Sequence, residues 1–413
     1  MKKANLILAA ALAAAGVTGG TAALLVPATA VAQAQQKIGA KMMKPLKAAQ
    51  DAIGQKNWQA ALASLAEAQA IEPKSPYEAF MVDELGWYAR IQTKDYKGAG
   101  ETLERAVASG FIAEADLPQR YKALAQINYQ VQDYPKAVEF GNKYLASAPG
   151  SVDVATLVAQ SKFLQNDFAG ARATVDQIAA TQEKPDEQLL LIGLRSSYEL
   201  KDRPATVRSL EALVRYYPAT KYWEDLLNNQ LYETKSDRDL RALYRLIFDT
   251  QTMNRPDEYS EAAATLTSGG FPTEAKKVLE QGIAAGAFQG EALTRAKADL
   301  QRAQSGADAD RKELPGADQA LATAKTGNEM VAMGKLFFSV GEYGKAADAF
   351  QKGVAKGGVT DVDDANMLTG MAHARAGKSA EAVAAFDAIK DAKLADVARL
   401  WKLHVQTSAA PAG

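Results

Sequence analysis

A short sequence unit recurs along this chain at intervals of 34 to 38 residues. In its clearest copies an aromatic residue follows a small polar turn, and an alanine stands three positions after the aromatic. The aromatics are Trp58, Tyr96, Tyr134, Phe168 and Tyr343, and the alanines are Ala61, Ala99, Ala137, Ala171 and Ala346. Weaker copies begin at Arg203, Asp237, Pro272 and Ser379, and the one wide interval spans two periods. A repeat of this length predicts one supersecondary unit per period, stacked on its neighbours into a continuous core.

The residues between these units favour helix throughout. Strong helix formers dominate, hydrophobic residues make up 47% of the chain, and no stretch shows the alternating β-branched pattern of a sheet. We therefore expect an all-α fold in which each period is a pair of helices. Alanine at the closest crossing lets the two helices approach, and the aromatic closes the end of the pair.

The pattern resembles the tetratricopeptide repeat family, in which two antiparallel helices occupy 34 residues. Lys94–Ala99, Gln132–Ala137 and Gly341–Ala346 closely match the family pattern for the turn and the start of the second helix. The family's first-helix signature is matched by Gly334 with Phe337 and by Gly370 with His373, and its final proline by Pro73, Pro149 and Pro218. The resemblance implies a right-handed α-solenoid of about ten helix pairs. Thr206 and Leu240 stand where the family has alanine, so we expect the central pairs to pack less regularly.

Changes in composition and helix-breaking Gly and Pro residues divide the chain into five blocks. We predict a signal peptide, a long run of repeats, a degraded repeat with an exposed loop, further repeats, and a capping helix with a loose tail. These blocks cover residues 1–32, 37–286, 287–325, 326–390 and 391–413. The exposed loop is placed at Ser305–Gly316 because this segment is polar and contains both Gly and Pro. The capping helix is placed at Leu394–Val405 by its apolar residues at helical spacing.

The first residues have the pattern of an export signal. Lys2 and Lys3 precede an apolar run that Pro27 ends, and Ala30–Ala32 offers a small-x-small cleavage site. We expect cleavage after Ala32 and a periplasmic protein, with retention of the run as an anchor as the alternative. The chain contains no Cys, which excludes disulfides and thiolate metal sites. Its net charge of −1 gives no electrostatic case for nucleic acid.

Few segments suggest chemistry. Ala372–Ser379 satisfies a permissive nucleotide-loop pattern, but it lies between two helices and repeats the turn seen elsewhere. The two histidines, His373 and His404, stand at packing positions of their helices. The acidic residues near Asp361 are expected to cap a helix rather than bind calcium. We expect no catalytic site, cofactor, metal or nucleotide.

The most promising surface is formed by the inward positions of the first helices, counted back from each turn. This count selects Gln119, Lys122, Gln126, Gln130, Gln160, Arg195, Tyr198, Tyr222, Asp225 and Asn229. Such polar and amide groups can hydrogen-bond an extended peptide, and Tyr adds rigid contact area. The alternative for each residue is an ordinary solvated position. The aromatic and basic stretch from Arg215 to Phe248 is a second candidate patch, although its spacing favours core positions for most of the aromatics.

The order of segments along the chain is also similar to that of exported tetratricopeptide proteins that accompany TonB-type energy-transduction systems. The similarity rests on Lys37–Gly39, Ala106–Phe111, Tyr222–Trp223, Gly270–Pro272 and Leu279–Gly282. It implies a periplasmic scaffold that docks envelope proteins. The alternative is an assembly factor for outer-membrane or cell-wall machinery. A third class, an enzyme or small-ligand receptor, would require a deep pocket with converging polar groups.

Overall fold

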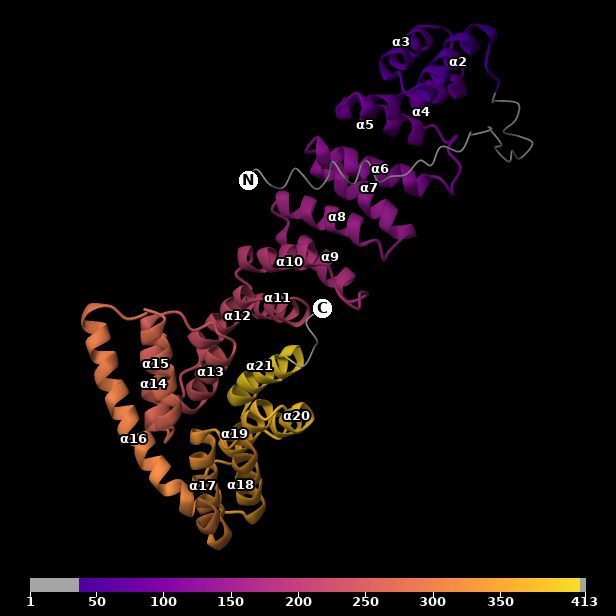
Figure 1. The fold of residues 1–413 in the computed structure, drawn as a ribbon. Coiled ribbons are helices and arrows are strands. Elements are labelled where there is room, and N and C mark those ends of the chain that lie inside the picture. The colour runs from indigo at the N-terminus through magenta and orange to yellow at the C-terminus, as the bar shows by residue number, and fades with distance from the viewer. Residues whose placement is uncertain (1–36, 409–413) are drawn as a thin grey trace. The chain divides into compact units, whose positions relative to one another are not determined.

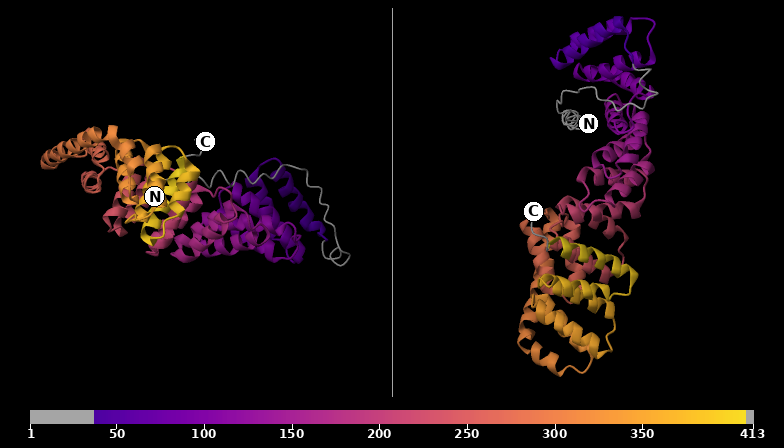
Figure 2. Two further views of the ribbon diagram at one scale, coloured as in Figure 1. Left: turned by 90° about the horizontal axis from the view of Figure 1, so that it is seen from below. Right: turned by 90° about the vertical axis from the view of Figure 1, so that its right-hand side faces the viewer.

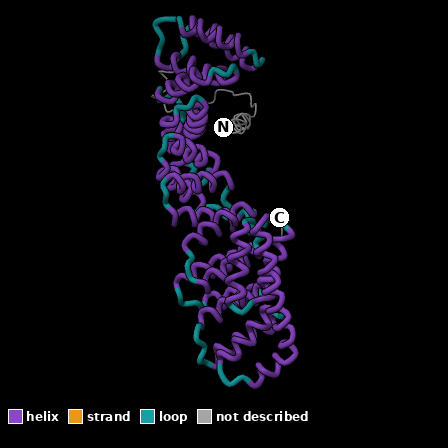
Figure 3. The backbone as a smooth tube through the Cα atoms, turned by 90° about the vertical axis from the view of Figure 1, so that its left-hand side faces the viewer, coloured by secondary structure: helices purple, strands orange, loops and turns teal. Residues whose placement is uncertain are grey.

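The computed structural model describes residues 37–408, which form twenty helices, and no strand occurs within this range (Figures 1 and 3). None of these helices is both long and apolar enough to span a bilayer. The chain divides into two compact units, with unit 1 ending at Asp202 and unit 2 beginning at Arg203. The predicted signal peptide, residues 1–32, and the predicted tail beyond Ser408 lie outside the described residues.

Unit 1 consists of helices stacked in chain order. Its helices are α2 (Ala40–Gly54), α3 (Trp58–Gln69), α4 (Pro76–Gln92), α5 (Tyr96–Ala108), α6 (Leu117–Gln130), α7 (Tyr134–Ser147), α8 (Val152–Leu164), α9 (Phe168–Ala179) and α10 (Glu187–Glu199). Each helix packs on the next one along the chain from α2 to α10, and first helices also touch across the intervening second helix, as α6 and α8 do. Figure 2 shows this succession in two further views. The even-numbered helices are the first helices of the predicted pairs.

The turns inside these pairs share one geometry. A non-glycine residue adopts a left-handed conformation two positions before each second helix: Lys56, Lys94, Gln132 and Asn166 have φ between 57° and 65°. The next residue is Asn or Asp, and its side chain accepts a hydrogen bond from the backbone N–H three positions later, at distances of 2.9 to 3.2 Å. This cap satisfies one of the amides left free at a helix start. The second helices therefore begin at the residues that the repeat predicts.

The alanines predicted at the helix crossings are fully buried. Ala61, Ala99, Ala137 and Ala171 in unit 1 have no exposed surface. Around Ala99 and Ala137 lies a core cluster that includes Leu103, Leu124 and Ile127, all fully buried. Larger side chains at the alanine positions would push the paired helices apart, because such interiors are already close-packed.

Unit 2 contains the remaining helices. They are α11 (Arg203–Tyr216), α12 (Thr220–Glu233), α13 (Asp237–Asp249), α14 (Pro256–Ser268), α15 (Pro272–Ala284), α16 (Gly290–Thr323), α17 (Gly327–Val340), α18 (Tyr343–Lys356), α19 (Val362–Arg375), α20 (Ser379–Asp387) and α21 (Ala392–Ser408). All four weaker copies of the repeat, like the clear ones, mark the first residue of a helix. Gly334 confirms the family signature in α17, because a Cβ there would lie 2.5 Å from the ring of Phe350 in α18.

The last helix of unit 2 returns to its beginning. Helix α21 covers α20, as the predicted capping helix does, and it also packs against α11, α13 and α19 (Figures 1 and 2). The Trp401 side chain is fully buried, and its Nε1 donates a 2.9 Å hydrogen bond to the carbonyl oxygen of Ala242 in α13. Arg399 of α21 pairs with Glu211 of α11. Unit 2 is thus closed by contacts between segments that are far apart in the sequence, 159 residues in the case of Trp401 and Ala242.

The predicted exposed loop at Ser305–Gly316 is wrong, because α16 runs as one helix of 34 residues through it. Ala296, Ala303, Ala307 and Ala317 are buried along this helix, which packs against α14, α15 and α17. Gly306 serves close packing rather than a turn, since a Cβ there would lie 2.6 Å from the side chain of Pro272. Pro315 removes one backbone hydrogen bond, but the buried alanine stripe holds the helix across that defect.

Candidate functional site

The predicted first-helix surface of unit 1 is only partly exposed. Gln119, Gln130, Arg195 and Tyr198 are exposed, and Gln160 is half-buried. These residues lie on three helices, α6, α8 and α10. They provide amide, guanidinium and phenol groups on successive first helices of one stack.

Two further residues predicted for this surface, Lys122 and Gln126, are not freely exposed. Lys122 is half-buried, and its Nζ pairs with Asp153 Oδ2 at 2.5 Å and lies 5.5 Å from the ring centre of Tyr144. Gln126 is buried, because α6 lies among α5, α7 and α8. The prediction that Gln126 offers a contact is therefore wrong, and Lys122 has its charge already paired.

In unit 2 the predicted surface residues are Tyr222, Asp225 and Asn229 of α12. Tyr222 is only 3% exposed and belongs to the core, so its prediction as a contact residue is wrong. Asp225 is exposed, whereas Asn229 is half-buried and donates from Nδ2 to the carbonyl oxygen of Asp225. The segment between α12 and α13 also lacks the left-handed residue that the other pairs have before their second helix.

Three sequence interpretations are confirmed by the geometry. Gly377 has φ of 72° and precedes the start of α20, as expected of a repeat turn rather than a phosphate loop. The Asp361 side chain caps α19 by accepting from the backbone N–H of Asp364 at 2.9 Å. His373 is buried at a packing position of α19. Of the seven aromatics from Arg215 to Phe248, Tyr222, Trp223 and Tyr244 are core residues, three others are half-buried, and Tyr232 is 75% exposed.

A cavity lined by aromatic and charged residues lies inside unit 2, and the sequence did not predict it. It has a volume of about 560 Å³ and is lined by residues of α13, α14, α15, α18, α19, α20 and α21. Apolar walls come from Phe248, Leu266, Val278, Trp401 and Val405. A volume in this range, with apolar walls and converging polar groups, is typical of a ligand site. This cavity is called the unit 2 pocket below.

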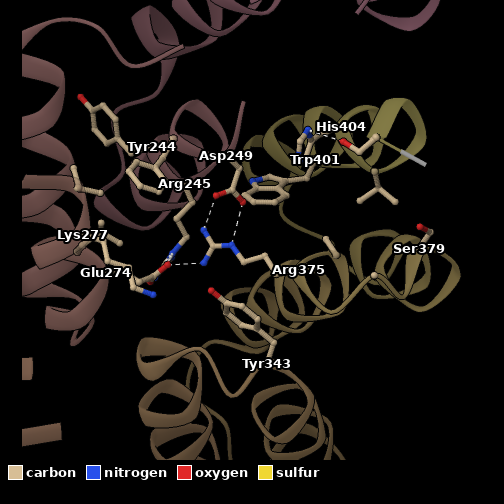
Figure 4. A pocket seen from close by; sticks show the side chains of 17 residues that line it. Tyr244, Arg245, Asp249, Glu274, Lys277, Tyr343, Arg375, Ser379, Trp401 and His404 are labelled. Carbon is tan, nitrogen blue, oxygen red and sulfur yellow. Dashed lines mark hydrogen bonds and ion pairs between the residues drawn. The ribbon is translucent and has the colours of Figure 1, made fainter. Parts of the chain in front are cut away.

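Two arginines and two carboxylates form a buried charge network on one wall of the pocket (Figure 4). Arg375 donates from Nε and Nη2 to the two oxygens of Asp249 at 3.0 and 3.1 Å, and from Nη1 to Glu274 at 2.6 Å. Arg245 donates from Nε and Nη2 to Glu274 at 2.7 to 3.2 Å. The network joins α13, α15 and α19, which are separated by up to 126 residues.

Aromatic rings cover the guanidinium groups of this network. The Arg245 guanidinium lies 4.1 Å from the ring centre of Phe271 and 5.1 Å from that of Phe338. The Arg375 guanidinium lies 5.2 Å from Phe338 and 5.5 Å from Tyr343. Stacking against aromatic faces suits arginine, whose planar cation is weakly hydrated.

The network shifts the pKa of two of its members, Glu274 and Arg375. Burial raises the pKa of Glu274, but Arg245 and Arg375 outweigh burial and hold the pKa below its usual value. Burial lowers the pKa of Arg375, while Asp249 and Glu274 raise it well above its ordinary value. At the other side of the pocket, burial lowers the pKa of His404. Glu274 and Arg375 are therefore charged at neutral pH, whereas the His404 imidazole is neutral.

No sequence spacing could have joined these side chains. Arg375 stands 101 residues from Glu274 and 126 residues from Asp249. A local signal is present in α13, where Arg245, four residues before Asp249, interrupts the buried apolar residues Leu243, Leu246 and Ile247. Such an interruption predicts buried charges, but it does not name their partners.

Comparisons with known proteins find similar solved structures but no relative by sequence. No family model matches the sequence, and no similar sequence is found among curated proteins. Similar solved structures include a tetratricopeptide repeat protein from Parabacteroides merdae, at 13% identity and a TM-score of 0.33, covering 81% of this chain and 99% of that one.

Two others are a chain of the Naa15/Naa10 complex bound to HypK-THB and the C-terminal part of a TPR repeat-containing protein from Cytophaga hutchinsonii. The first has 14% identity and a TM-score of 0.40, covering 88% of this chain and 66% of that one. The second has 11% identity and a TM-score of 0.35, covering 63% and 93%. These values are too low to carry an argument about function. By its helix pairs, their turns and the small residues at their crossings, the chain is an all-α solenoid of tetratricopeptide-like repeats.

Proposed function

We propose that this protein is a non-catalytic periplasmic scaffold that binds other envelope proteins through the first helices of unit 1. Gln119, Gln130, Arg195 and Tyr198 carry this proposal, because they are exposed on the first helices of a stack whose core is sealed. Their groups can hydrogen-bond an extended backbone, and Tyr198, 46% exposed, offers apolar contact area.

The rigidity of this surface supports the proposal. Lys122 of α6 is tied to Asp153 of α8 at 2.5 Å, and Arg120 of α6 pairs with Glu84 of α4. These bonds link three successive first helices directly. A surface that is fixed before binding loses less conformational entropy when a partner docks.

The cellular setting of the proposal rests on the sequence. The charged start and the apolar run before Pro27 support export, and the order of segments supports a partner in a TonB-type energy-transduction complex. We therefore propose that the partner is an inner-membrane subunit of such a complex.

Site-specific photocrosslinking in living cells tests the binding surface. A benzophenone amino acid is placed at Gln130 of α6 or Arg195 of α10, and the captured proteins are identified by mass spectrometry. The matched control carries the same group at Gln177, which is exposed on the second helix α9. We expect capture of energy-transducing subunits at the first two positions and little capture at Gln177.

The outcomes separate the parts of the proposal. Equal capture at all three positions, or none at the first two, would refute the first-helix surface. Capture of outer-membrane assembly or wall-synthesis proteins at Gln130 and Arg195 would retain the surface but refute the TonB-type partner. A charge reversal, Arg195→Glu, should abolish capture at Gln130 if both residues contact one partner.

A further inference from the structure

We propose that the unit 2 pocket binds a monoanionic carboxylate carried on an apolar chain. This site lies in unit 2 and does not depend on the first-helix surface of unit 1. Either proposal can therefore fail without the other.

The charge balance of the pocket favours an anion. Its lining contains the cations Arg245, Lys277 and Arg375 against the carboxylates Asp249 and Glu274, which leaves one positive charge. Both carboxylates form ion pairs with the two arginines. Lys277 is exposed and has no carboxylate partner among the described residues, so its charge is available at the pocket. A net charge of +1 matches a singly charged carboxylate better than a phosphate dianion.

The hydrogen-bonding capacity of the pocket also favours an acceptor. A guanidinium carries five N–H donors, and the network uses only two on Arg245 and three on Arg375. Lys277 adds an ammonium group one helical turn beyond Glu274 on α15, and Figure 4 shows the two side by side. Each oxygen of the two carboxylates already accepts at least one of these bonds. Among its charged groups, the pocket therefore has more N–H donors than the two carboxylates use.

The remaining walls suit an apolar chain. Phe248, Leu266, Val278 and Val405 face the cavity together with the Trp401 ring, and the volume of about 560 Å³ is large enough for a medium-length acyl chain or apolar side chains. His404 and Ser379 lie across the pocket from Lys277 (Figure 4). Such a pocket would hold the carboxylate at its cationic side and the chain against the aromatic and aliphatic walls.

Titration calorimetry on the full chain tests this assignment with two carboxylate probes. The probes are octanoate and an acetylated Leu-Leu dipeptide with a free terminal carboxylate, and the neutral controls are octanamide and the dipeptide amide. We expect at least one carboxylate to bind about tenfold or more tightly than its amide, as expected for the loss of a charge-assisted hydrogen bond. Binding of octanoate alone would indicate a free small molecule, and binding of the dipeptide acid a protein terminus.

Two lysine variants decide whether the pocket is responsible. Lys277→Gln should weaken binding of the carboxylate about tenfold and leave the amide unaffected. Lys297→Gln, at an exposed lysine of α16 outside the pocket lining, should leave both unchanged. Equal binding of acid and amide, no binding of either acid, or full binding by Lys277→Gln would overturn the inference. Both lysines are exposed, so neither variant should prevent folding.

Discussion

Replacing Glu274 with Gln should destabilise unit 2 strongly, because this carboxylate neutralises two buried guanidinium groups. It receives charged hydrogen bonds of 2.6 to 3.2 Å from Arg245 and Arg375, and its side chain is 8% exposed. After the substitution Asp249 alone faces two arginines, and one buried positive charge remains uncompensated. Breaking a buried ion pair in this way costs about 3–5 kcal/mol.

Urea unfolding measures this change in unit 2 alone if the fluorescence of unit 1 is removed. Trp58 and Trp87 lie in unit 1, whereas Trp223 and Trp401 lie in unit 2. In a Trp58→Phe/Trp87→Phe background, tryptophan emission therefore reports on unit 2. The matched control is Asp348→Asn, which breaks the exposed pair with Lys352 on α18 and should leave the midpoint nearly unchanged.

The same variant should change how stability depends on pH. The pKa of Glu274 is lower in the folded protein than its ordinary value of 4.5. Its contribution is therefore fully present above about pH 4.5 and is lost as the pH falls through the folded-state pKa. The difference between wild type and Glu274→Gln should be constant near neutral pH and shrink in acid. A loss below about 1 kcal/mol at pH 7, or a difference that grows in acid, would refute the role given to the network.

Three further substitutions test the repeat itself by urea unfolding. Ala137→Leu should overpack the fully buried crossing of α6 and α7 and cost about 1–3 kcal/mol, and an unchanged midpoint would contradict the register. Gly334→Ala should also destabilise the protein, because its Cβ would lie 2.5 Å from the Phe350 ring. Gly344→Ala, with open space around its Cβ, should stabilise the protein by up to about 1 kcal/mol. A Gly334→Ala variant that is more stable than Gly344→Ala would refute the packing account. Asp167→Ala should cost about 1 kcal/mol by removing the cap of α9, and Asp167→Asn should restore most of it.

The repeat register could be predicted from the sequence because each signal acts locally. An aromatic, an alanine three residues later and a capping Asp or Asn before them determine where a second helix begins and how closely it packs. These requirements are satisfied within one period, so no knowledge of the rest of the fold is needed. For this reason even the weak copy at Pro272 marks the start of a helix correctly.

The features that could not be predicted depend on contacts between distant segments. Ser305–Gly316 is helical because its small residues pack against α15 and α17, although its composition alone favours a loop. Tyr222 is buried, although the count back from the turn predicts a contact position for it. The unit 2 pocket exists only because α21 returns to α13, and neither helix indicates the other in its sequence.

The packing of α21 against α11 and α13 is tested most directly by crosslinking of introduced cysteines. The sequence contains no Cys that could react in their place. The double variant Glu211→Cys/Arg399→Cys replaces an ion pair between α11 and α21, and a short bismaleimide should link the two thiols within one chain. The control pairs Arg399→Cys with Arg295→Cys, on the exposed surface of α16. A closed unit 2 predicts rapid intramolecular crosslinking of the first variant only. Folded protein that gives no crosslink between positions 211 and 399, or equal crosslinking in both variants, would contradict the closure.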